Sequence, residues 1–179
     1  MHLFSDLVER CTGDTLIRLD QLNTDVLHEL QVSGSTNMVK ALQAVQLQKV
    51  IFAVGMFSIF EAQLQNAFGD HTGHAFDTVR EVLKERNQGT LNTRFLDVQD
   101  AINALKHGRG RSYDRLIARV ADLEFRVRLP DELYFVEGDA SEVDSLVLVD
   151  ERFISTCSEV IVQVSDALRD WNPQLKFYL

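Results

Sequence analysis

The sequence predicts a mainly α-helical bundle with one small β-hairpin before its C-terminal helix. Apolar residues recur at helical spacing over most of the chain, only two of the 179 residues are proline, and hydrophobic residues make up 45% of the composition. Only the stretch between Pro130 and Asp150 changes to an extended, β-branched pattern. A chain of this length can bury a full core, so we expect a single domain over residues 1–179.

The first half of the chain is expected to form three helices. One begins near the N-terminus and breaks at Thr12-Gly13, and a second covers residues 14–30. Ser33-Gly34-Ser35 separates these from the longest apolar segment, which runs from Met38 to Phe68. The middle of this segment is apolar nearly all round, which is typical of a helix in the centre of a bundle.

The same apolar run predicts where the protein is found. Val50 to Phe60 is about half the length of a membrane span and is interrupted by Gly55 and Ser58. The N-terminus has the pattern of an amphipathic helix and not that of a cleavable signal. We therefore expect a cytoplasmic protein with no membrane partner. Gly55 would also let a neighbouring helix approach closely.

Further helices and the hairpin are expected in the second half. A short helix should end near Arg86, Asn92 or Thr93 should cap the next helix, and Ser112 should cap the one after it. The two extended runs, 133–136 and 146–149, flank an acidic turn. The expected bounds are about 92–107, 112–123 and 150–171 for the last three helices and about 133–149 for the β-hairpin.

The most informative stretch runs from Asn103 to Ser112, where a helix ends in a histidine and a glycine-spaced arginine loop follows. Asp100, Asn103 and His107 form a polar stripe opposite the apolar face of this helix. Histidine exchanges protons near neutral pH, so His107 could transfer a proton while Asn103 hydrogen-bonds it or a substrate. The alternative is a helix-terminal histidine that interacts with the C-terminal dipole.

A basic segment surrounds this histidine, although the chain as a whole has a net charge of -9. Residues 105–128 carry a net charge of +4. Their seven cations are Lys106, Arg109, Arg111, Arg115, Arg119, Arg126 and Arg128. Lys106, Arg109 and Arg111 are candidate phosphate contacts, because Gly108 and Gly110 expose backbone N–H groups beside them. The segment predicts a local site for a polyanion and not indiscriminate coating of nucleic acid.

Two motifs resemble the HEPN superfamily over roughly residues 36–125. One is Phe57-Ser58-Ile59-Phe60-Glu61 in the apolar helix, and the other is Asn103-Ala104-Leu105-Lys106-His107-Gly108. The resemblance implies an α-helical, usually dimeric domain that in many members is a metal-independent ribonuclease. It also implies a homodimer whose interface includes the helix that ends at His107, with a site shared between protomers.

The family signature places an arginine before the histidine with four to six residues between the two, often with Asn, Asp or His directly after the arginine. His107 fits the histidine and Asn103 fits the polar residue, but the three positions open to the arginine hold Asp100, Ala101 and Ile102. The resemblance implies that His107 is the general acid/base and that Asn103 orients it. Loss of a preorganised donor costs on the order of 10²–10³ in rate.

Two functions therefore stay open. The first is a HEPN-like protein that binds RNA or a nucleotide, either as a binding protein alone or as a metal-independent ribonuclease with a degenerate site. The second is a non-catalytic interaction module of a defence or toxin–antitoxin system, in which the arginines contact an acidic partner protein. We expect no cofactor in either case.

Other polar clusters favour solvated surface over chemistry. His71 and His74 lie beside Asp70 and Asp77, but the segment is a glycine-containing loop without a third strong ligand, so we expect no metal site. Glu61 is expected at the exposed end of a bundle helix. The acidic turn 137–144 lacks calcium-loop spacing. The two cysteines, Cys11 and Cys157, match no metal-ligand spacing and are expected to be reduced and mostly buried.

Overall fold

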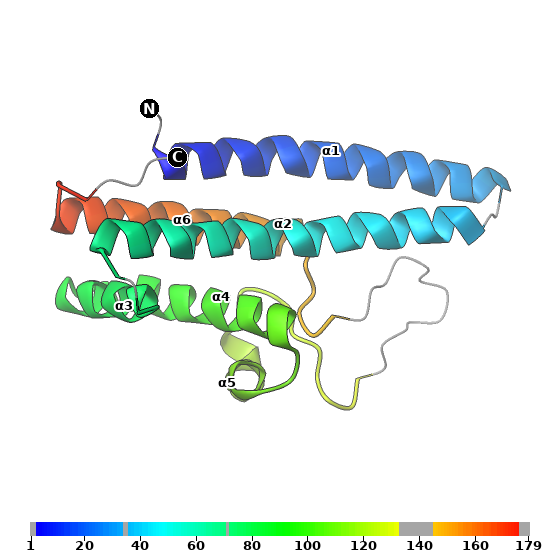
Figure 1. Cartoon of the computed structure of the whole chain (residues 1–179). Helices are drawn as coiled ribbons and strands as arrows, with labels where there is room; N and C mark the ends of the chain where they lie inside the picture. Colours follow the sequence, from blue (N-terminus) through cyan, green and yellow to red (C-terminus); the bar gives the residue numbers. More distant parts are fainter. Residues whose placement is uncertain (1–2, 34–35, 71, 133–144, 176–179) are drawn as a thin grey trace.

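The computed structural model describes residues 3–33, 36–70, 72–132 and 145–175. In these residues the chain forms a bundle of six α-helices and one short 3-10 helix, η1, which confirms the predicted mainly α-helical bundle (Figure 1). The elements are α1 (Phe4–Ser33), α2 (Thr36–Phe68), α3 (Ala75–Glu85), α4 (Gly89–His107), α5 (Arg111–Ala118), η1 (Val120–Asp122) and α6 (Glu151–Trp171).

Helix α1 is continuous, so the break expected at Thr12-Gly13 is wrong. Glycine inside a helix costs about 1 kcal/mol relative to alanine. Val8, Thr12 and Leu19 are all buried, and α1 packs along α2 and α6 on both sides of the glycine. Tertiary packing on this face therefore outweighs the local preference for a turn.

Helix α2 is the central helix of the bundle, as its apolar pattern predicted, and it contacts α1, α3, α4 and α6. Phe57 and Phe60 are almost completely buried. The ring of Phe57 lies 5.4 Å from that of Phe76 and 5.9 Å from that of Phe95, between ring centroids. The Phe60 ring stacks on Phe4 at 6.1 Å, which ties the start of α1 to the core.

Helix α2 is also long and apolar enough to cross a membrane by length and composition alone. Its most apolar 18-residue window has a mean hydropathy of 1.4, and 33% of that window is buried inside the bundle. A core helix of a soluble protein and a membrane span share these properties, so α2 does not by itself place the protein in a compartment.

The helices of the second half differ from the prediction at their N-termini. Helix α4 begins at Gly89, and its N-cap is Gln88, so the caps expected at Asn92 or Thr93 are wrong. The Gln88 carbonyl accepts the first helical hydrogen bond from the Asn92 N–H at 2.9 Å. Helix α5 has Gly110 as its N-cap, without a side-chain cap, and it stops at Ala118 before a short 3-10 turn.

The expected β-hairpin is not seen. Its first run, 133–136, lies outside the described residues, which contain no strand, only one antiparallel bridge between Val127 and Val147. The Leu148 N–H donates to the Arg126 carbonyl, and the Arg128 N–H donates to the Leu146 carbonyl, both at 3.0 Å. The second run therefore pairs with a segment before Pro130.

The prediction placed both strands of the hairpin after Pro130, whereas the second run pairs with a segment before it. Val127 and Val147 are both buried, and Val149 is buried while Leu148 is exposed. This alternation shows that the second run is extended with one face towards the core, as its period of two indicates.

Helix α6 follows the prediction closely. The Asp150 side chain accepts a hydrogen bond from the Phe153 N–H at 2.8 Å, which is a capping interaction at the N-terminus. Along α6, Ile154, Ile161 and Leu168 are fully buried at a spacing of seven residues. This helix packs against α1, α2, α3 and α4 and closes the bundle.

Candidate functional site

His107 is the last residue of α4, and the chain turns away immediately after it. Gly108 has φ 77°, a left-handed conformation that favours glycine, and its N–H donates to the Ala104 carbonyl at 2.9 Å. The side chains of Lys106, His107, Arg109 and Arg111 are all exposed. The structure thus brings the four predicted residues to one exposed turn between α4 and α5, which we call the basic turn (residues 106–111; Figure 1).

The base of the basic turn is anchored to the rest of the fold. Tyr113 is buried, and its hydroxyl donates to the Arg128 carbonyl at 2.6 Å. The Arg109 guanidinium lies 5.9 Å from the centroid of the Tyr113 ring, a cation–π contact. The contacts of Tyr113 therefore fix the backbone of the basic turn against the rest of the fold.

Asn103, the predicted orienting partner, is half-buried one turn before His107. Among the described residues no hydrogen bond joins the two side chains. Asn103 is adjacent to the basic turn in sequence and on the helix, but the structure does not place it in contact with the imidazole. Its role stays a prediction.

The polar stripe of α4 was expected to lie opposite the core along its whole length, but part of it is covered. Asp100 is only 3% exposed and lies under α5. The Arg115 Nε donates to the Asp100 Oδ2 at 2.7 Å, and a second guanidinium nitrogen pairs with the other carboxylate oxygen. Arg115 also donates to the Ser112 Oγ at 3.2 Å. Asp100 is thus part of a clamp between α4 and α5, and Ser112 accepts a hydrogen bond where a cap was expected.

Much of the predicted basic segment is neutralised by acids from outside it. Arg115 pairs with Asp100, Arg119 donates to Asp97 at 2.7 Å, and Arg126 pairs with Glu132. Lys106 and Arg111, by contrast, make no ion pair with any residue that the structure describes. The surface available to a polyanion therefore shrinks from residues 105–128 to the basic turn.

The positions where the HEPN signature would allow an arginine all point into the protein. Asp100, Ala101 and Ile102 are exposed by 3%, 0% and 3%. A side chain at any of them would have to leave the core to reach a phosphate beside His107. An arginine at any of these positions would therefore be covered by α5 and the core.

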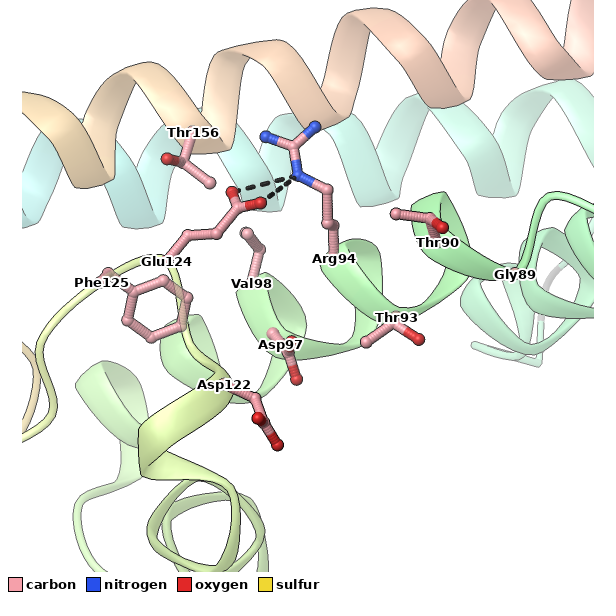
Figure 2. Close-up of a pocket in the computed structure, with 10 residues that line it drawn as sticks. All are labelled: Gly89, Thr90, Thr93, Arg94, Asp97, Val98, Asp122, Glu124, Phe125 and Thr156. Atoms are coloured by element: carbon pink, nitrogen blue, oxygen red, sulfur yellow. Dashed lines mark hydrogen bonds and ion pairs between the residues drawn. The ribbon is translucent and has the colours of Figure 1, made fainter.

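A polar cavity lies elsewhere on α4 and is lined by Arg94 and Glu124 among others, with a volume of about 400 Å³ (Figure 2). The Arg94 Nε donates to Glu124 at 2.9 Å. Its two terminal nitrogens donate to Gln163 and Glu159, both at 3.0 Å. Burial lowers the pKa of Arg94, but the hydrogen bonds with Glu124 and Glu159 outweigh it and raise the pKa.

Arg94 is a structural clamp and does not belong to the basic turn. Its three nitrogens already have acceptors, and it lies thirteen residues before His107, about 20 Å along the helix. It ties α4 to α6 and to the segment after η1. This network could not be predicted from the sequence, because its acceptors lie 30, 65 and 69 residues away in the chain.

Replacement of Arg94 by lysine should lower the free energy of unfolding by about 1–2 kcal/mol, because one ammonium cannot satisfy three separated acceptors. Urea unfolding followed by circular dichroism measures the change. The matched control is Arg111→Lys at an exposed position, which should leave the midpoint unchanged. Equal midpoints for both variants would contradict the clamp.

The second cluster weighed from the sequence lies partly outside the described residues. His71 lies outside the described residues, and no group of three metal-ligating side chains occurs in the described part of the chain. The Asp70 carboxylate accepts from the Thr72 N–H and hydroxyl at 2.7 and 2.5 Å, which lowers its pKa. Asp77 pairs with Arg80 and contacts the His74 Nδ1 at 3.3 Å. These contacts shape a turn.

The remaining candidates are quickly placed. Glu61 is half-buried two turns before the end of α2, and the acidic turn 137–144 lies outside the described residues. Cys157 is completely buried, which raises the pKa of its thiol. Cys11 is exposed, so the expectation that both thiols are mostly buried is wrong for Cys11.

In comparisons with family models, with curated proteins and with solved structures, no match to this chain is found.

Proposed function

We propose that the basic turn is a HEPN-like site that binds the phosphates of single-stranded RNA without cleaving it. The observation that carries the proposal is the exposure of Lys106, His107, Arg109 and Arg111 on one anchored turn. Arg115, Arg119 and Arg126 pair with carboxylates, whereas Lys106 and Arg111 make no ion pair with any residue that the structure describes. Cations on a short rigid turn suit successive phosphates of a flexible strand.

The start of α5 adds donors to the same place. The first helical hydrogen bond runs from the Asp114 N–H to the Gly110 carbonyl, so the N–H groups of residues 111 and 112 have no partner within the helix. Such groups bind anions at helix N-termini. Tyr113 is buried under the turn, so we do not assign it a base-stacking role.

Binding without cleavage follows from what surrounds His107. In the HEPN signature, an arginine on the same helix as the histidine is the preorganised donor that stabilises charge on the scissile phosphate, and a lysine or an arginine of an exposed surface turn lacks that fixed position. The candidate positions on α4 are buried, and the nearest paired arginine, Arg115, is held by Asp100. His107 then contributes a hydrogen bond and, when protonated, a charge to binding.

The salt dependence of RNA binding tests the proposal. Affinity for a single-stranded RNA should fall steeply with salt, and Arg109→Ala/Arg111→Ala should reduce the slope of log K against log[salt] by about 1.4, or two phosphate contacts. Arg86→Ala/Arg152→Ala removes the same charge from exposed residues of the other elements and should leave the slope nearly unchanged. Fluorescence anisotropy with a labelled oligonucleotide measures both.

Three outcomes would contradict the proposal. No RNA binding at low salt, or an unchanged slope in the Arg109/Arg111 variant, would favour the acidic protein partner. RNA cleavage by the wild type that persists in EDTA and is lost in His107→Ala would make the site a ribonuclease, since acid–base assistance is worth about 10²–10⁴-fold.

A further inference from the structure

One face of the α1–α2 pair is apolar and open. Three large side chains of α2, those of Leu47, Ile51 and Ile59, are exposed by 50%, 62% and 47%. At 100° per residue they fall within about 120° of one another, with Gly55 between the two isoleucines. We call this row the α2 stripe. An exposed row of this kind marks an interaction site on a soluble protein or a lipid contact.

The α2 stripe is uncharged, although the chain has a net charge of -9. Between Lys40 and Glu61 the one charged residue of α2 is Lys49, and its side chain is buried. A partner that covers the stripe must therefore present an uncharged surface itself, because a charge buried against it would have no counter-ion.

A groove lies beside the stripe, between α1 and α2. Its volume is about 410 Å³, and its walls are apolar: Leu7 and Cys11 from α1 face Ile51, Gly55 and Ile59 from α2. An apolar groove between two helices accepts side chains from a third helix that packs across it, as ridges fit grooves in helix packing.

Gly55 at this groove has no explanation within the single chain. A Cβ atom added to Gly55 would meet nothing within 4 Å. Glycine at this mid-helix position therefore costs about 1 kcal/mol relative to alanine without relieving any internal contact. A helix from outside the chain could therefore approach α2 closely at Gly55.

The charges that border the groove are arranged symmetrically. Asp6, Arg10, Asp14 and Arg18 alternate in sign at four-residue spacing along α1, all four are exposed, and Arg10 lies 4.0 Å from Asp14 of its own helix. A shallow hollow that contains Arg10, Asp14 and Arg18 shares Leu7 and Cys11 with the groove. Asp6 and Arg18 lie equally many residues before and after Thr12, and so do Arg10 and Asp14.

Thr12 also marks the level of Gly55 on the neighbouring helix. Its hydroxyl donates to the Met56 sulfur at 3.5 Å. A two-fold axis at this level, perpendicular to both helices, would place Arg10 of each copy opposite Asp14 of the other. The same axis would place Asp6 opposite Arg18, so the rim is complementary to itself.

We propose that a second copy of this chain docks antiparallel on the α2 stripe, with the two-fold axis at the level of Thr12 and Gly55. Ile51 and Ile59 of each copy enter the groove of the other and form the apolar centre of the interface. The alternating charges of α1 form its polar rim. This is the isologous, self-complementary arrangement that a two-fold dimer requires.

This dimer goes beyond the proposed RNA site and does not depend on it. Helix α1 lies on one side of the bundle and α5 on the other (Figure 1). Most of α4 is covered by α2, α3, α5 and α6, and only its ends are exposed. The dimer therefore presents two separate basic turns, in place of the shared site at His107 implied by the HEPN resemblance.

Mutation of the centre of the interface is the first test. Wild type should sediment as a dimer at tens of micromolar, and Ile51→Glu should raise the dissociation constant more than about 100-fold, because it buries a charge without a partner. Val120→Glu is the matched control, since Val120 is 39% exposed on η1, away from α1 and α2. A monomeric wild type, or equal effects of the two variants, would overturn the proposal.

A charge exchange tests the orientation. Arg10→Asp and Asp14→Arg should each weaken the homodimer about tenfold, because each sets two like-charge pairs across the axis. Mixing the two variants should produce a heterodimer, in which both rim pairs are again opposite in charge. Native mass spectrometry distinguishes the three species. Homodimers that persist without enrichment of the heterodimer would exclude the antiparallel two-fold.

Two further measurements separate the partner classes. Gly55→Leu should dissociate the dimer while circular dichroism shows unchanged or higher helix content, since a Cβ atom at this position meets nothing within 4 Å and leucine favours a helix more than glycine does. Phosphatidylcholine vesicles should not carry the wild type in flotation. A monomeric wild type that floats with vesicles and is released by Ile51→Glu would assign the stripe to lipid and overturn the dimer.

Discussion

Placing the missing family arginine on α4, as Ile102→Arg, is expected to destabilise the protein by about 3–5 kcal/mol without creating ribonuclease activity. Ile102 is 3% exposed and belongs to the main hydrophobic cluster. A guanidinium there would be buried without a carboxylate partner or would force α4 away from the core. Either result removes the geometry that an active site needs.

Urea unfolding and RNA cleavage should be measured together on this variant. Lys106→Arg, four residues along the same helix, is the control and should leave stability nearly unchanged because Lys106 is exposed. A stable Ile102→Arg protein that cleaves RNA would contradict the binding-only function. It would show that α4 can present this position beside His107.

Truncation of Phe60 to alanine is expected to cost about 3–5 kcal/mol and to lower the melting temperature by roughly 10 °C. Phe60 is fully buried, and its ring packs on both Phe4 and Phe57. The cavity would open where α1 meets α2, so both helices should lose stability together.

The neighbouring residue provides a matched control. Ile59→Ala should change monomer stability by less than about 1 kcal/mol, because Ile59 is 47% exposed. The two variants should be compared at a protein concentration at which the chain is monomeric, so that dimer contacts do not contribute. Equal losses would show that the faces of α2 have been assigned wrongly.

The elements that the sequence predicted well are those whose signals are local. Helices α2 and α6 carry long apolar patterns and sharp ends, and Asp150 is a side-chain cap next to the residue that it caps. The errors arose where distant contacts decide. Gly13 stays helical because α1 packs on α2 and α6, and Val147 pairs with Val127 across twenty positions of chain.

The same difference between local signals and distant contacts applies to the candidate site. Lys106, His107, Arg109 and Arg111 are neighbours in sequence, so their gathering on one exposed turn could be predicted. The pairing of Arg115 with Asp100 could not, because it depends on α5 folding back onto α4. The sequence predicted that the helix carrying the α2 stripe lies in the centre of a bundle. Periodicity identifies apolar faces, but it does not show what covers them.

The clamp between Asp100 and Arg115 makes the basic turn part of the folding equilibrium. The buried carboxylate has a counter-charge only while α5 lies on α4, so opening of α5 breaks its charge-assisted hydrogen bonds with Arg115. The turn is thereby held in one arrangement before any ligand arrives, and little conformational entropy remains to be lost on binding. By mutual linkage, a ligand that grips the turn also strengthens the hold of α5 on the bundle.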